Sequence, residues 1–186
     1  MNHIFQIIIN FFKRLFGSSQ PTVPPEELPE INLAFADLAN MLTHEKNNPV
    51  PNLEFFGSLN MDYSLESIKH IDKYLLSIQK IDLSENDKFI PVVLRTAAYV
   101  GESIRKNDQS KKWYWIDFET AKQQKPDFLN GIDHSLEYAA ILTNGNSMSF
   151  PLNKVMKFIK NGEEDSLYHF AYFILNYDES KVENEV

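Results

Sequence analysis

Most of the first 17 residues of the chain are apolar, and if this segment is helical its polar residues fall on one narrow face. A stretch of about 13 helical residues covers about 20 Å, well short of the roughly 30 Å core of a bilayer. The pattern therefore predicts an amphipathic helix over residues 1–17 that is too short to cross a membrane. Its polar residues fall mostly three or four positions apart: His3, Gln6, Asn10, Lys13 and Arg14.

This helix has two possible roles. As an interfacial anchor it would bury apolar side chains at the acyl boundary and place its cations among lipid headgroups, giving reversible attachment. As a docking helix it would pack on the protein's own core or on a partner. Its positive charges follow the apolar run, unlike those of a secretory signal peptide. The residues expected to contact a membrane are Phe5, Ile8, Phe12, Lys13, Arg14 and Phe16.

Residues 18–30 contain four prolines, which favour an extended, semi-rigid linker. A single α+β domain is expected over residues 31–177, followed by a frayed acidic tail at residues 178–186.

Helical periodicity recurs three times in the first half of this domain, over residues 31–44, 64–80 and about 85–107. Ser64 is a good N-cap for the second helix, and Pro91 suits the first turns of the third. The third helix also carries small residues that should let another backbone approach closely. These are Ala97, Ala98 and Gly101.

The period then changes to that of strands at residues 113–118, 138–143 and 147–150. Asn144-Gly145 between the last two predicts a β-hairpin. Pro151 opens a short helix, and a final helix is expected to begin with acidic residues 163–165 in its first turn. The predicted fold is thus α+β: helices, a small antiparallel sheet with an Asn-Gly hairpin, then two C-terminal helices.

The composition of the chain excludes several classes of function. The chain has 18 Lys+Arg against 26 Asp+Glu, a net charge of −8, and no cysteine. An acidic domain is a poor binder of nucleic acid, so no nucleic-acid partner is expected. Without cysteine there is no thiolate metal site or cysteine nucleophile. No glycine-rich phosphate loop or nucleophile elbow is present, and the five histidines are isolated. Neither a metal nor a cofactor is expected.

One polar cluster stands out on the predicted helices. Asp72 falls inside the apolar stripe of the 64–80 helix, and Glu102 and Arg105 border the buried face of the 85–107 helix. Tyr99 lies further round that helix. A carboxylate turned toward a core needs a hydrogen-bonding or charged partner.

Two interpretations of this cluster remain open. In the structural one, Asp72 with Arg105, or Glu102 with Arg105, forms a partly buried ion pair between adjacent helices. In the functional one, these side chains line a ligand pocket with Trp113 or Trp115 as an aromatic wall. Arg105 would then bind an anionic group and Glu102 a cationic or hydroxyl group.

An ordered series of motifs runs through residues 55–175: D-x-S-x-E-S-I-x-x-I-D over 62–72, Y-x-G-E-x-I-R over 99–105, then Trp113, and N-G-E-x-D-S-L over 161–167. Together they resemble a widespread group of small uncharacterised bacterial α+β domains. The resemblance implies a bacterial cytoplasmic module without an assigned activity. It singles out Asp72, Glu102, Arg105 and Trp113 as positions to test.

The expected function is a non-enzymatic binding or interaction module for a protein or small ligand. It would act in the cytoplasm, held at the inner face of the membrane by residues 1–17. One alternative is a small enzyme with Glu102 or Asp72 as general base and Arg105 as anion clamp. A second is an immunity-type protein that neutralises a toxin.

Overall fold

The computed structural model describes residues 29–83 and 87–176. The amphipathic segment 1–17, residues 18–28 of the linker and the acidic tail lie outside this range, and linker residues Pro29 and Glu30 belong to the first described helix. The helices are α2 (Pro29–His44), α3 (Leu65–Ile78), α4 (Phe89–Asn107), α5 (Phe118–Gln124), α6 (Pro151–Asn161) and α7 (Leu167–Asn176); the strands are β1 (Tyr114–Asp117), β2 (Ala140–Thr143) and β3 (Met148–Ser149); the 3-10 turns are η2 (Leu53–Phe56), η3 (Leu136–Tyr138) and η4 (Gly162–Asp165).

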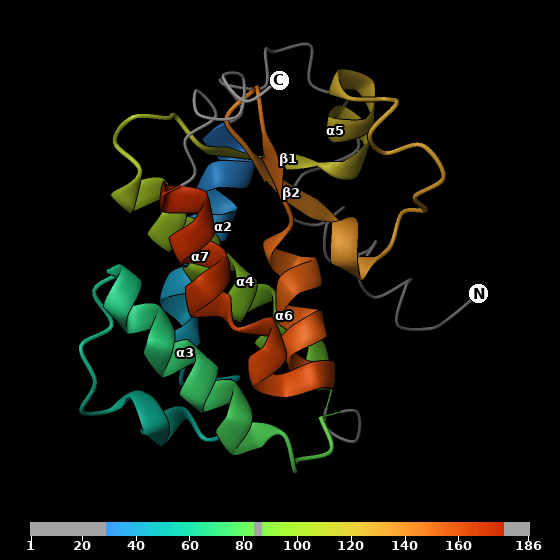
Figure 1. Cartoon of the computed structure of the whole chain (residues 1–186). Helices are drawn as coiled ribbons and strands as arrows, with labels where there is room; N and C mark the ends of the chain where they lie inside the picture. Colours follow the sequence, from blue (N-terminus) through green and yellow to red (C-terminus); the bar gives the residue numbers. More distant parts are fainter. Residues whose placement is uncertain (1–28, 84–86, 177–186) are drawn as a thin grey trace.

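The fold is α+β, as predicted. The small sheet lies at one end of the molecule and α3 at the other, with α4 running behind α6 and α7 (Figure 1). Ser64 caps α3 by accepting a hydrogen bond from the backbone N–H of Ser67 at 3.2 Å, which confirms the predicted N-cap. No helix among the residues described is long and apolar enough to cross a membrane.

Helix α4 is the centre of the core. It packs against α2, α3, α6 and α7, and every residue from Val92 to Ile104 is buried. The sequence predicted that only one face of this helix would be buried, whereas its whole circumference is buried over this stretch. Most of its buried polar side chains are hydrogen-bonded, Thr96 being an exception; for example, the Arg95 guanidinium donates to the carbonyl of Asn48 at 2.8 Å.

Gly101 shows why α4 needs small residues. A Cβ atom at this position would lie 2.5 Å from Cη2 of Trp115 and closer still to Cζ2. The Trp115 ring is fully buried and stacks on Phe35 of α2 at 4.0 Å between centroids. The prediction of close approach is thus correct, but the neighbour that approaches is an indole side chain and not a backbone.

The sheet is antiparallel in the order β1-β2-β3, with Trp115 opposite Leu142 and Leu142 opposite Ser149. These three residues share one face, the face on which Trp115 packs against α2 and α4, because directly paired side chains point the same way. The other face is covered by α5. The predicted hairpin is present: Gly145 has φ +88°, and the Asn144 side chain accepts from the backbone of Ser147 at 2.8 Å.

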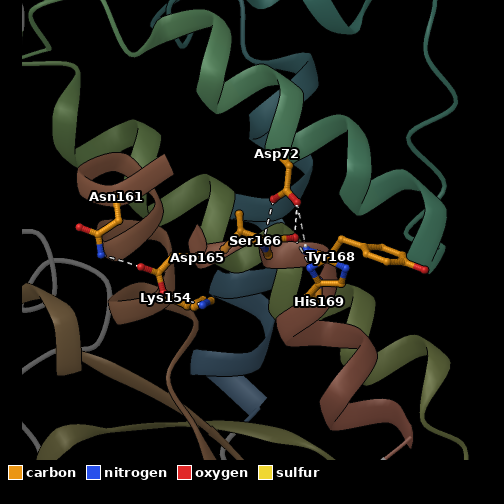
Figure 2. Close-up of polar contacts among 8 residues, drawn as sticks. Asp72, Lys154, Asn161, Asp165, Ser166, Tyr168 and His169 are labelled. Carbon is orange, nitrogen blue, oxygen red and sulfur yellow. Dashed lines mark hydrogen bonds and ion pairs between the residues drawn. The ribbon is translucent and has the colours of Figure 1, made fainter. Parts of the chain in front are cut away.

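The start of the last helix differs from the prediction. The acidic residues 163–165 belong to the separate turn η4, and α7 begins at Leu167. The turn is fixed to α6 through Asp165, which pairs with Lys154 at 2.7 Å and accepts from Asn161 at 2.6 Å (Figure 2). The acidic residues of η4 therefore do not cap α7, and a carboxylate from elsewhere in the chain accepts hydrogen bonds at its N-terminus.

Candidate functional site

That carboxylate is Asp72 of α3. Its Oδ2 accepts a hydrogen bond from the Ser166 hydroxyl at 2.7 Å, and its Oδ1 accepts from the backbone N–H of Leu167 at 2.9 Å. The N–H of Tyr168 approaches Oδ2 at 3.4 Å. Figure 2 shows the side chain reaching down from α3 onto the first turn of α7. Asp72 therefore caps a helix distant in sequence, and no ion pair joins it to Arg105.

Two effects act on the Asp72 carboxyl. Burial raises its pKa above the ordinary value, while the hydrogen bonds from Ser166 and the two backbone amides, and the nearby His169, oppose that rise. The side chain is half-buried and holds α3 against α7, which is a structural task.

Glu102 and Arg105 do form an ion pair, at 2.7 Å, within α4 and not between two helices. Glu102 is 4% exposed, and the oxygen that binds Arg105 also accepts from Nε1 of Trp115 at 2.9 Å. Arg105 Nε donates to the carbonyl of Trp113 at 3.0 Å. Through its bonds to Trp113 and Trp115, the pair joins α4 to β1. The structural interpretation expected a partly buried ion pair, which is present, but placed it between two helices.

Tyr99 links α4 to the start of α3. Its hydroxyl donates to Oγ of Ser67 at 2.8 Å and accepts from the backbone N–H of Tyr63 at 3.0 Å. The Tyr99 and Tyr63 rings stack at 4.6 Å between centroids. Burial raises the pKa of the Tyr99 hydroxyl, which keeps it protonated as a donor.

Trp113 precedes β1 and donates from Nε1 to Asp108 at 2.8 Å. Although burial works the other way, hydrogen bonds from Ser110 and Trp113 hold the pKa of Asp108 below its usual value. Trp113 also lines one of the two cavities described below, whereas Asp72, Tyr99, Glu102 and Arg105 line neither. The structure therefore brings together Glu102, Arg105 and Trp113, and leaves Asp72 and Tyr99 in separate contacts.

The cavity beside Trp113 has a volume of about 450 Å³ and lies between the β2–β3 hairpin, α6 and α7. We call it the hairpin cleft. Its walls are mainly apolar, and the described residues that line it include three lysines but no Asp or Glu. The residues that matter below are the apolar Trp113, Met148, Phe150, Phe170 and Ile174, the polar Ser149, and the cationic Lys111, Lys154 and Lys157.

Ser149 is unusual within the hairpin cleft. The residue is 5% exposed, and its hydroxyl oxygen is buried with no hydrogen-bond partner among the residues that the structure describes. Leaving a buried hydroxyl unpaired costs about 1–3 kcal/mol. Ser149 lies on the same sheet face as Leu142 and Trp115. Its neighbours Met148 and Phe150, which also line the cleft, pack against the cluster on the face covered by α5.

A second, wider cavity of about 1110 Å³ lies between the end of α2, residues 49–61 and residues 81–83. Lys88 at its border donates to the Asn48 side chain at 2.6 Å and to the Pro49 carbonyl at 3.1 Å, so this cation holds the loop. Neither buried hydroxyl left without a partner, in Ser149 or Thr96, lines this cavity.

Sequence analysis missed the hairpin cleft. It predicted the helix that Pro151 opens but did not weigh Lys154 and Lys157, which stand three residues apart and so share one side of the helix. The spacing of Phe170 and Ile174 on α7 is a matching signal. Only the fold shows that these two helix faces meet beside the hairpin.

Within the described ranges, no group of three His, Asp or Glu side chains is placed to hold a metal ion. A comparison of the chain with protein-family models, with curated proteins and with solved structures finds no match.

Proposed function

We propose that this domain is a non-enzymatic binding module that takes a small ligand in the hairpin cleft. The observation that carries the proposal is an apolar cavity of about 450 Å³ whose lining includes Ser149, a buried residue whose hydroxyl has no hydrogen-bond partner among the described residues. Small-molecule sites are typically clefts of roughly 300–1,000 Å³ with apolar walls and a few polar groups that fix the ligand's orientation.

The contacts of the candidate catalytic residues favour binding over catalysis. A general base must come within about 3 Å of the proton that it removes. Glu102 is almost fully buried and is engaged by Arg105 and Trp115, and Asp72 is engaged by the first turn of α7. Neither carboxylate lines either cavity.

A pair of probes tests this proposal: octanoate and 1-octanol, titrated calorimetrically into the full chain. We expect at least one of them to bind, and we expect Ile174→Phe, which fills the hairpin cleft, to weaken that binding at least tenfold. The matched control is Ile81→Phe in the wider cavity, where Ile81 is 41% exposed. If neither probe binds, or if Ile81→Phe has the larger effect, the cleft is not the ligand site.

The attachment of the module to a membrane is a separate proposal, supported by the sequence of residues 1–17. Their apolar side chains and two cations suit reversible binding to an anionic bilayer surface. The acidic remainder of the chain would be repelled by the same surface.

Vesicle flotation tests the attachment. Vesicles of phosphatidylglycerol and phosphatidylcholine should carry the full chain and lose it when residues 1–17 are removed. Replacing Lys13 and Arg14 by Gln should weaken the attachment, and vesicles of phosphatidylcholine alone should bind less. Equal flotation of full-length and shortened chains would rule out the anchor.

A further inference from the structure

The hairpin cleft has a charge opposite to that of the chain around it. The whole chain carries a net charge of −8, yet among the residues that the structure describes this cavity is lined by three lysines and no carboxylate. Lys154 is already paired with Asp165 at 2.7 Å. Lys157 is exposed and forms no salt bridge within the part of the chain that the structure describes, although its charge also helps to lower the pKa of Asp165. The rim is therefore suited to an anion, and Lys157 is the cation available to it.

The interior of the hairpin cleft is suited to an apolar group, in contrast to its cationic rim. Trp113 and Phe170 provide aromatic walls, and Met148 and Ile174 provide flexible and branched aliphatic ones. Burying a ligand's methylene groups there removes apolar surface from water, so each one tightens binding. An ion without an apolar body would gain nothing from these walls.

Ser149 favours a third feature in the ligand, a hydrogen-bond acceptor. Its buried hydroxyl lacks an acceptor in the described residues, so a ligand that supplies an oxygen atom would relieve the cost of that unpaired group. A carboxylate provides both the negative charge for Lys157 and oxygen atoms that can accept from Ser149. An alcohol provides an acceptor without the charge.

Building on the proposed function, we infer that the hairpin cleft selects amphiphilic carboxylates, with the apolar body against Trp113, Phe170 and Ile174. The carboxylate is held by Lys157, and the Ser149 hydroxyl donates to a ligand oxygen. Selectivity for the anion then comes from the lysine rim, and affinity comes from the apolar walls.

The same calorimetric titration tests the inference with two single substitutions. Octanoate should bind about tenfold more tightly than 1-octanol, because a hydrogen bond from Lys157 to a carboxylate is stronger than one to a neutral hydroxyl. Lys157→Gln should remove most of that preference and leave 1-octanol unchanged. Its matched control is Lys160→Gln, an exposed lysine of α6 that does not line the cleft. Ser149→Ala should weaken octanoate binding several-fold without loss of stability.

Each contrary result has one meaning. If 1-octanol binds as tightly as octanoate, the inference is wrong while the proposed binding cleft stands. If neither binds, the proposed function itself fails. If octanoate binds but Lys157→Gln and Lys160→Gln act alike, the anion is not held at this rim. A synthetic peptide of residues 177–186 that displaces octanoate with higher affinity would assign the cleft to the chain's own acidic tail and overturn the inference.

Discussion

Replacing Asp72 by alanine removes the acceptor at the start of α7. The Leu167 and Tyr168 amides and the Ser166 hydroxyl then lose their partner, and Leu167 itself is fully buried. Loss of a helix N-cap costs about 0.5–2 kcal/mol, and an unsatisfied buried donor costs about 1–3 kcal/mol. Because these contributions overlap, we expect Asp72→Ala to lower the free energy of unfolding by about 2–3 kcal/mol. For a chain of this size that corresponds to a fall in Tm of about 4–12 °C.

Urea unfolding followed by circular dichroism measures this change. Amide hydrogen exchange should lose protection at Leu167 and Tyr168 before it does so in α4. The matched control is Asp37→Ala on the exposed side of α2, which should stay within about 0.5 kcal/mol of the unmodified chain. An Asp72→Ala variant as stable as the Asp37→Ala control would refute the capping role.

A comparison with Asp72→Asn removes the charge. Asn keeps one acceptor oxygen for α7, carries an NH2 donor in place of the second acceptor and cannot ionise, so the charge is read from the pH dependence and not from the stability difference itself. Because burial raises the pKa of Asp72 above 3.8, the folded chain holds this proton more tightly than the unfolded chain does. The resulting stabilisation is fully present below about pH 3.8 and is lost as pH rises through the folded pKa. Between about pH 3.8 and the folded pKa, the free energy of unfolding of the unmodified chain should therefore fall relative to that of Asp72→Asn. At higher pH the difference between the two free energies should stay constant. An opposite slope would contradict the burial argument.

Three further substitutions test the core around α4. Gly101→Ala should destabilise the fold by about 2 kcal/mol, since overpacking against the immobile Trp115 ring outweighs the roughly 1 kcal/mol gain in helix propensity; a more stable variant in urea unfolding would contradict that contact. Glu102→Ala should cost about 2–3 kcal/mol by leaving Arg105 and the Trp115 N–H without their acceptor, and should not alter octanoate affinity in calorimetry; lost binding with an intact fold would restore Glu102 as a ligand residue. Tyr99→Phe should cost about 1–2 kcal/mol in thermal unfolding because it breaks the link from α4 to α3, and an unchanged Tm would argue against that link.

The fold class followed from local signals in the sequence. The Ser64 cap, the Asn144-Gly145 turn and Pro151 at the start of α6 each act over a few residues, and each was predicted correctly. The start of α7 was not, because local sequence favoured acidic residues 163–165 for its first turn. The actual cap comes from Asp72, about 95 positions earlier in the chain, which only the tertiary fold brings there.

The candidate site was harder to predict for the same reason. Asp72 and Glu102 were correctly identified as carboxylates that need partners, but helical angles could not say which partners they find. The side chains that line the hairpin cleft come from the segment before β1, from β3 and its flanking residues, and from α6 and α7, and none of these forms a motif by itself. Ser149 carries no signal in the sequence at all, since its importance lies in a hydroxyl left unpaired by the packing around it.

The most direct test of the central claim is a ¹H–¹⁵N NMR titration of the full chain with octanoate. The account predicts shifts at residues 147–150, along the Lys154–Lys157 side of α6, on α7 from Phe170 to Ile174, and at the indole N–H of Trp113. Shifts confined to residues 49–61 and 81–83, or to α4 around Glu102, would contradict it.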